Sequence, residues 1–150
     1  MTASAHAVIG AAIVAKIPDL RISLPLALLS HFVGDMPDHW DAGEHWQKIG
    51  LKKVAFGATL DLAIGYIIIA LSFVWWLKLD PVNIFLGAII AQLPDYLEIP
   101  YFFLGWRGVP WKWVNDVQLI FHKKLPQIYL TATHQIILIA IIIALVAVTK

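Results

Sequence analysis

The sequence of 150 residues contains no cysteine, and only 14% of its residues are charged. Without cysteine the chain forms no disulfide bond and offers no thiolate to a metal ion. Soluble domains have about 25% charged and about 45–50% apolar residues, whereas 60% of this sequence is hydrophobic and its mean hydropathy is +0.77. This composition excludes a disordered chain and a coiled coil, and the surplus of apolar side chains must face lipid.

A large excess of charge of one sign is also lacking, since the net charge is only +1. No nucleic-acid partner is therefore expected. The chain has no glycine-rich phosphate loop, no Gly-x-Ser-x-Gly elbow and no His-Glu-x-x-His pair, so the enzyme classes built on those motifs are excluded. What the sequence does have is a small set of six histidines and ten carboxylates, placed within or at the ends of apolar runs.

Five apolar segments predict the fold, and they cover residues 3–17, 22–36, 54–77, 82–104 and 128–149. A helix needs about 20 residues to cross a hydrocarbon core about 30 Å thick. The third and fifth segments are long enough, and the fourth qualifies as a helix that bends at Pro94 and Pro100. The first two are marginal spans or short helices packed within the bundle. We therefore predict an all-α integral membrane bundle of about five helices, with residues 1–150 as one transmembrane domain and the lipid bilayer as its partner.

The basic residues predict the orientation of this bundle in the membrane. If segments three to five each cross once, seven of them lie on one side, which the positive-inside rule assigns to the cytoplasm. We therefore expect a multi-pass protein of the cell (inner) membrane whose 37–53 and 105–125 loops are cytoplasmic. The seven residues are Lys48, Lys52, Lys53, Arg107, Lys112, Lys123 and Lys124.

The chain also shows a weak internal duplication. Residues 26–39 resemble residues 85–96, and residues 58–61 resemble residues 132–135, which are each followed by an isoleucine-rich run. A repeated helix pair would place Asp38 and Asp95 in related positions, and likewise Asp61 and His134.

The densest polar cluster is His31-x3-Asp35-x2-Asp38-His39. Residues i and i+4 share a helix face, so His31 and Asp35 lie on one stripe, and His39 extends it if Pro37 permits. Imidazole nitrogen and carboxylate oxygen are ligands of zinc and other first-row metals. This cluster therefore predicts part of a metal site.

Further ligands for such a site come from other segments. With the topology above, four helices bring histidine or aspartate to one depth on the cytoplasmic side. The alternatives are that a lone histidine is a hydrogen-bonded packing residue and that Pro-Asp is a helix stop followed by a cap, as we expect for Asp19. Asp61 differs, because an ionisable residue within a spanning helix is costly and by default functional. The additional candidates are His6, Asp61, Asp95, His122 and His134.

Several of these motifs resemble those of the small bacterial and archaeal inner-membrane metal-dependent hydrolases, which are distantly similar to zinc-dependent phospholipase C and P1-type nucleases. The order of the motifs differs from the usual one, and Tyr96-Leu97-Glu98 stands where an Asp-His pair is expected after Asp95. The His31-Phe32-Val33-Gly34-Asp35 stretch resembles the metal helix of the nucleases, where the aspartate bridges metals and a later histidine, here His39, also binds. The matching residues are His6, Ser30-His31 with Asp35, Pro94-Asp95, His122-Lys123 and Thr133-His134.

Residues and resemblance together lead us to expect a hydrolase in which a divalent metal, zinc, activates water against a phosphoester such as a phospholipid headgroup. One alternative is a divalent-metal or proton transporter or channel that uses the same residues, and another is a non-catalytic relative. The sequence sets neither the substrate nor the oligomeric state. The expected metal ligands are His6, His31, Asp35, His39, Asp95, His122 and His134; the expected catalytic carboxylates are Asp35, Asp38 and Asp61; and a phosphate could be bound by Lys52, Lys53, Lys123 and Lys124, which interfacial anchoring explains equally well.

Overall fold

The computed structural model describes residues 1–37, 46–121 and 128–149, and every regular element within these ranges is a helix. The predicted all-α class is thus confirmed. Segment four forms two helices, and the short α3 and the longer α7 were not expected from the sequence. The elements are α1 (Ala3–Lys16), α2 (Leu20–Asp35), α3 (Trp46–Ile49), α4 (Leu51–Ile69) with its π-helical continuation η2 (Ala70–Trp76), α5 (Pro81–Ala91), α6 (Leu93–Phe103), α7 (Trp111–Phe121) and α8 (Ile128–Val148).

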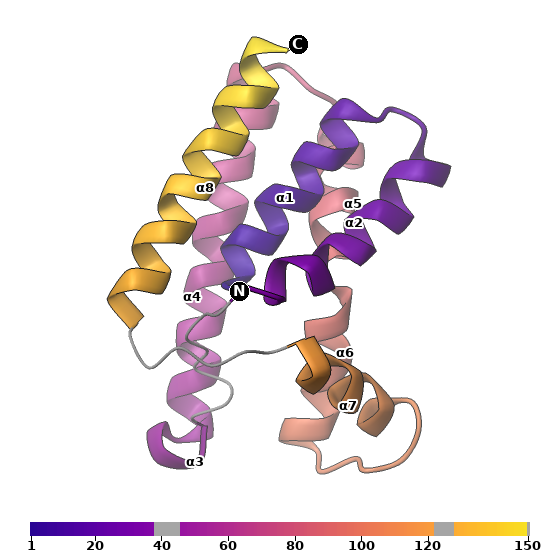
Figure 1. The fold of residues 1–150 in the computed structure, drawn as a ribbon, viewed down its shortest axis with the longest axis vertical. Helices are drawn as coiled ribbons and strands as arrows, with labels where there is room; N and C mark the ends of the chain where they lie inside the picture. The colour runs from indigo at the N-terminus through magenta and orange to yellow at the C-terminus, as the bar shows by residue number, and fades with distance from the viewer. Residues whose placement is uncertain (38–45, 122–127, 150) are drawn as a thin grey trace.

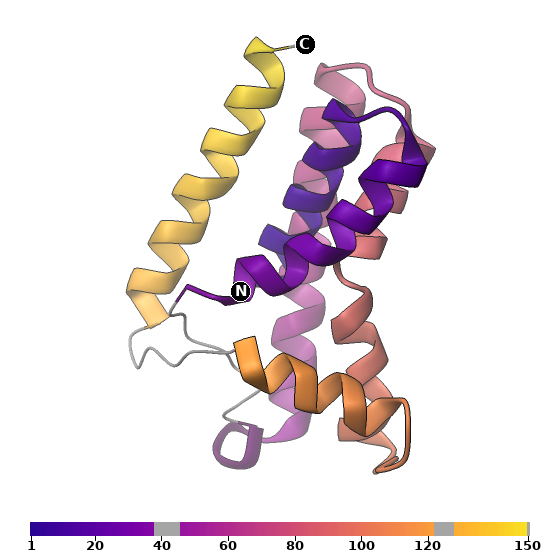
Figure 2. The ribbon, with the colours of Figure 1, turned by 45° about the vertical axis from the view of Figure 1, so that its right-hand side comes forward.

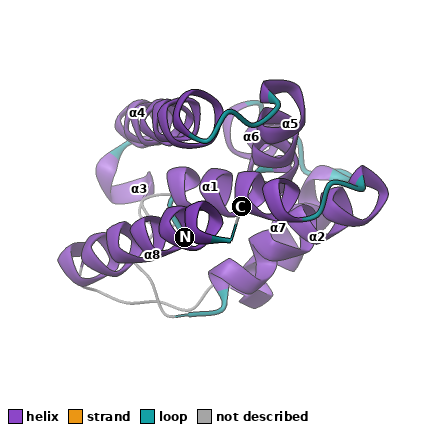
Figure 3. Ribbon diagram, turned by 90° about the horizontal axis from the view of Figure 1, so that it is seen from above, coloured by secondary structure: helices purple, strands orange, loops and turns teal. Residues whose placement is uncertain are grey.

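Helix α1 lies at the centre of the bundle, where α2, α4, α5 and α8 contact it. The first two helices form an antiparallel hairpin beside the upper part of the long α4 (Figure 1), and the view from above shows α1 enclosed by its neighbours (Figure 3). The N-terminus therefore lies near the middle of the molecule rather than at an end. Helix α7 runs across the long axis below the hairpin (Figure 2).

Local sequence signals explain where several helices begin. The carboxylate of Asp19 accepts a hydrogen bond from the backbone N–H of Arg21 at 2.9 Å, and that of Asp80 accepts from the N–H of Asn83 at 2.8 Å. These side chains satisfy N–H groups that have no partner within the first turn of a helix. The predicted capping role of Asp19 is confirmed.

The predicted bend in segment four is present, since α5 and α6 meet at an angle of 49°. The break falls at Gln92, just before Pro94, whose ring removes a backbone donor and disfavours helical geometry in the preceding residue. At this break the carbonyl oxygen of Ala91, the last residue of α5, accepts a hydrogen bond from a buried side chain of α2.

Small residues allow α1 to approach its neighbours closely. A Cβ atom added to Gly10 would lie 2.3 Å from the carbonyl oxygen of Gly87 on α5, and one added to Gly65 on α4 would lie 2.7 Å from the Cα of Ser4. Helices meet this closely only where side chains are absent from the contact, as in membrane proteins. The apolar core continues from there toward the upper end of the bundle and contains Ala7, Val8, Ala11, Ile69, Phe73, Ile84 and Ala88.

Within the described residues, the continuous helix Leu51–Trp76 is long and apolar enough to cross a membrane, and the bent pair α5–α6 qualifies as a second span if it is counted as one. Only 11% of the most apolar window of Leu51–Trp76 is buried, so most of its side chains lie outside the core of the bundle, to which Ile69 and Phe73 contribute. The exposed side chains include Phe56, Leu60, Ile64, Ile67 and Leu71. The multi-pass topology and its orientation remain predictions.

Candidate metal centre

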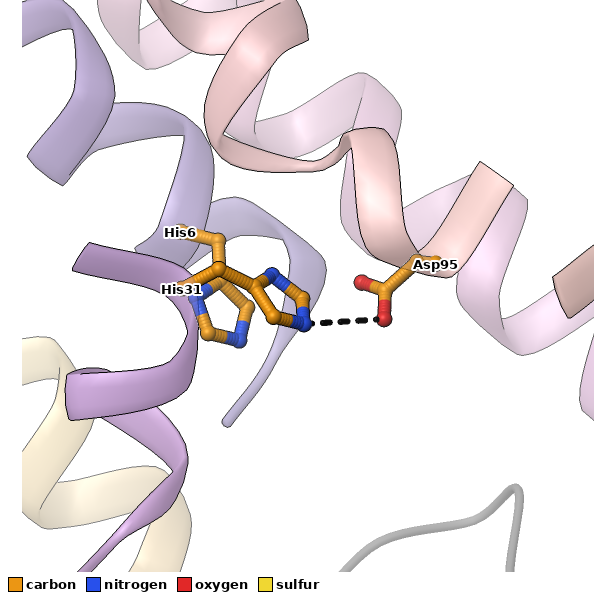
Figure 4. A group of neighbouring side chains, drawn as sticks. All are labelled: His6, His31 and Asp95. Atoms are coloured by element: carbon orange, nitrogen blue, oxygen red, sulfur yellow. Dashed lines mark ion pairs between the residues drawn. The ribbon is translucent and has the colours of Figure 1, made fainter. Parts of the chain in front are cut away.

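Three ligand-type side chains from three helices meet at mid-height in the bundle. They are His6 of α1, His31 of α2 and Asp95 of α6 (Figure 4). Each offers one ligand atom, and these atoms all lie within 4.8 Å of one another. Two imidazoles and a carboxylate are a donor set that zinc and related divalent metals accept. The group could therefore hold a metal ion.

His31 is completely buried, and its ring is fixed by a hydrogen bond. Its Nδ1 lies 2.9 Å from the carbonyl oxygen of Ala91. A carbonyl oxygen can only accept, so Nδ1 carries the hydrogen and the neutral ring has its lone pair on Nε2. That nitrogen lies 3.4 Å from Oδ2 of Asp35 and 3.4 Å from Oδ1 of Asp95. A lone pair facing two carboxylates is repulsive unless a proton or a metal cation lies between them.

The His6 ring stacks on that of His31, with ring centroids 4.1 Å apart and an interplanar angle of 21°. Its Nε2 lies 3.1 Å from Oδ1 of Asp35, and its Nδ1 is buried without a hydrogen-bond partner among the described residues. Gly34 provides the room for this ring, since an added Cβ there would lie 3.2 Å from Cε1 of His6. His6 lies outside both candidate spans, and burial lowers its pKa, which favours the neutral ring that a metal requires.

Asp35 connects the two histidines, because each of its carboxylate oxygens faces a different imidazole. It also forms an ion pair with the α-ammonium group of Met1. Burial acts to raise the pKa of Asp35, but the hydrogen bond from His6 and the surrounding positive charges outweigh it and hold the pKa well below its usual range. Asp35 is therefore an ionised carboxylate directly beside the three-residue group.

Asp95 is the most accessible member of the group. Its side chain is 41% exposed, whereas the side chains of His6, His31 and Asp35 are at most 4% exposed. It is the first acidic residue of α6 and follows the break at Gln92. A molecule from outside therefore reaches the group on the side of Asp95.

Asp61 lies apart from this group, at the first turn of α1. Its Oδ2 accepts from the backbone N–H of Ser4 at 2.9 Å, and its Oδ1 accepts from the hydroxyl of Ser4 at 2.6 Å. Two glutamines hold the same turn: Oε1 of Gln135 accepts from the N–H of Thr2 at 2.8 Å, and Nε2 of Gln92 donates to the carbonyl oxygen of Ala3 at 2.6 Å. Glutamine is not a usual metal ligand, so neither residue was a candidate from the sequence. The one sequence feature that indicates a role for them is that they are polar residues within apolar runs.

The structure thus brings together four of the predicted site residues, namely His6, His31, Asp35 and Asp95. It does not place Asp61 in that group, and the side chains of His134, Lys52 and Lys53 are exposed. The predicted site residues outside the described ranges are Asp38, His39, His122, Lys123 and Lys124.

Comparison with family models, with curated proteins and with solved structures finds no match to this chain. The resemblance to inner-membrane hydrolases is an expectation that rests on the motifs alone.

Proposed function

We propose that the protein is a multi-pass membrane hydrolase that holds a divalent metal ion, zinc, with His6, His31 and Asp95 and cleaves a phosphoester such as that of a phospholipid headgroup. One observation carries the proposal. The hydrogen bond to Ala91 directs the Nε2 lone pair of His31 at two carboxylate oxygens, each 3.4 Å away. A metal cation at this point turns a repulsive arrangement into a bound one.

The residues present fit such an ion. His31 has the second hydrogen bond, from its other ring nitrogen to a backbone carbonyl, that metal-binding histidines usually make. The buried Nδ1 of His6 has no hydrogen-bond partner among the residues that the structure describes, and a bound ion would satisfy it. Asp35 balances the charge of a divalent ion together with Asp95.

The chain's own groups have distinct roles in the proposed reaction. A bound zinc ion supplies a water of lowered pKa and polarises a phosphoryl oxygen. The carboxylate of Asp35 accepts a hydrogen bond from the His6 ring and so orients it. Asp95 lies on the accessible side and so lies beside the entering substrate. The surrounding helices exclude bulk water and strengthen these electrostatic interactions.

The position of the group favours hydrolysis over transport. The helices of the group also pack against their neighbours through an apolar core that contains Ala7, Val8, Ile69, Phe73 and Ile84. A transport path through the bundle would have to cross these packed side chains, whereas a hydrolase needs access from one side only. The site is proposed to face the cytoplasm, as the basic residues of the sequence suggest.

The depth of the group favours a lipid substrate. Asp61, which contacts the first turn of α1, lies ten residues from Leu51, or about 15 Å along α4. If Leu51–Trp76 crosses the bilayer, the metal group lies below the membrane surface. A lipid can enter such a site laterally from its own leaflet, on the exposed side of Asp95.

Elemental analysis and an activity assay test the proposal together. Protein purified in detergent without chelator should contain zinc, and it should hydrolyse phospholipid in mixed micelles. The variants His31→Ala and Asp95→Ala should lose both properties, whereas His134→Ala, which removes an exposed histidine, should keep them. A parent protein without bound metal contradicts the proposal, and metal without turnover of any phosphodiester refutes its catalytic part.

A further inference from the structure

The first turn of α1 is held by side chains of other helices rather than by its own cap. Thr2 is in the N-cap position and makes no capping hydrogen bond with its side chain within the part of the chain described. The N–H groups of a first helical turn have no partner inside the helix. Here Asp61 accepts from Ser4 and Gln135 accepts from Thr2. Capping is thus supplied across 57 residues by α4 and across 133 residues by α8.

The sequence of α4 suits this contact at two positions on one face. Asp61 and Gly65 are four residues apart, so they lie one above the other on the helix. The glycine permits the approach, because an added Cβ there would lie 2.7 Å from the Cα of Ser4. The carboxylate then meets the positive end of the α1 dipole, where a negative charge is stabilised. This explains how an aspartate is tolerated within the apolar helix Leu51–Trp76.

The metal ligand His6 belongs to the same turn. It follows Ser4 by two residues, and its own N–H donates to the carbonyl oxygen of Thr2 at 3.2 Å. Its ring contacts Oδ1 of Asp35 through Nε2 at 3.1 Å and stacks on the ring of His31. Because His6 belongs to the first turn of α1, these contacts require that the backbone of this turn is held in place.

We infer that Asp61 is a positioning residue, which sets the His6 ligand by capping α1, and that it neither binds metal nor transfers protons. Both of its carboxylate oxygens accept hydrogen bonds from Ser4. These contacts account for an aspartate at this position without a metal ligand or a proton-transfer role. The inference rests on the proposed metal function only for its effect on affinity, since the position of His6 can be measured without metal.

The first arm of the test is metal-free. The full chain, labelled with ¹⁵N in its histidine rings, is examined by NMR in detergent micelles, with the His6 signals assigned through His6→Ala. Asp61→Ala should shift the His6 signals more than those of His31, which stacks on the His6 ring, and Asp61→Asn, which retains one acceptor oxygen, should restore part of the shift. The matched control is Asp80→Ala, which removes an aspartate cap from α5 at the far end of the bundle and should leave both rings unchanged. If Asp61→Ala fails to fold, Ser4→Ala replaces it in this test. That variant removes only the hydroxyl contact with Asp61 and should give a smaller shift of the His6 signals.

The second arm measures zinc affinity in a double-mutant cycle. Asp61→Ala should weaken zinc binding by about 10–100-fold, as expected for a residue that orients a ligand. In a His6→Ala background the same change should have no further effect, because its influence passes through His6. Equal losses in both backgrounds, or His6 signals that do not move, overturn the inference. A parent chain that binds no zinc refutes the proposed function instead, and the NMR arm then decides the positioning role.

Discussion

The contact between α1 and α5 makes a quantitative prediction for Gly10→Ala. The added Cβ would lie 2.3 Å from the carbonyl oxygen of Gly87 and 2.5 Å from the Cβ of Ala91. Carbon and oxygen atoms normally approach to about 3.3 Å, so the two helices must separate by about 1 Å. The first of these atoms belongs to the backbone and cannot rotate away.

Overpacking of this kind costs about 1–3 kcal/mol, and the gain in helix propensity from alanine returns about 0.5–1 kcal/mol of it. The net cost is then up to about 2.5 kcal/mol, and for a chain of this size we expect the midpoint of thermal unfolding to fall by up to roughly 10 °C. The metal group should also be disturbed, because Ala91 carries the carbonyl oxygen that fixes His31. Zinc binding should therefore weaken although no ligand is changed.

Thermal unfolding in detergent, followed by helical circular dichroism, measures the effect. The matched control is Gly57→Ala on α4, where an added Cβ meets no atom of the described residues within 4 Å. That variant should be unchanged or more stable by up to about 1 kcal/mol. If Gly10→Ala is as stable as Gly57→Ala and binds zinc as the parent does, the close approach of α1 and α5 is wrong.

Three further predictions concern the site and the membrane. Gly34→Ala places a Cβ 2.8 Å from Cε of Met1, the end of a flexible side chain, and 3.2 Å from Cε1 of the buried His6 ring, so calorimetric titration should show weaker zinc binding with little change in the unfolding midpoint; unchanged affinity would contradict the packing of that ring. Asp35→Asn removes the charge between the two histidines and should lower zinc affinity by about 10–100-fold in a chelator competition, and retained affinity would exclude Asp35 from the site. Because the chain lacks cysteine, a spin label can be attached at Leu60→Cys alone, and in vesicles it should be more accessible to oxygen than to a water-soluble nickel complex; the reverse would show that this face of α4 is not in lipid.

Much of the fold could be predicted from the apolar pattern, because each long apolar run forms a helix and the Pro94 region bends as expected. Helix α7 was not predicted, because Gly105, Gly108 and Pro110 just before it are typical of a loop, although Val114 and Gln118 within it have the i, i+4 spacing of one buried helix face. Its position is set by contacts with α6 and α2, and short-range sequence signals do not contain such contacts.

The pairing of His31 with Asp35 follows from helical spacing, and the convergence of His6 and Asp95 on them was predicted from depth in the membrane. The sequence of α8 does not show which of its faces is turned toward the bundle. His134 was the predicted ligand, whereas its neighbour Gln135 faces α1. A helix that is apolar all round has no amphipathic pattern to show which side faces inward. His134 was therefore predicted only because imidazole is a common metal ligand.

The sequence likewise does not predict that Asp61 and Gln135 cap α1. The tetrapeptides 58–61 and 132–135, which suggested a duplication, end in these two residues, and both accept hydrogen bonds from the start of α1. The duplication predicts that His134 corresponds to Asp61, whereas in the structure Gln135 is the residue that shares the contact with α1. Gln135 and Asp61 lie 133 and 57 residues from the residues of α1 that they contact, so short-range sequence patterns do not reveal these hydrogen bonds.

A zinc titration against a chromophoric chelator tests the central claim most directly, that the meeting point of α1, α2 and α6 binds a divalent metal. Metal-stripped parent protein should bind zinc, His31→Ala should bind it at least about tenfold more weakly, and the exposed His134→Ala should bind as the parent does. No zinc binding by the parent protein, or an equal loss in both histidine variants, would contradict the account.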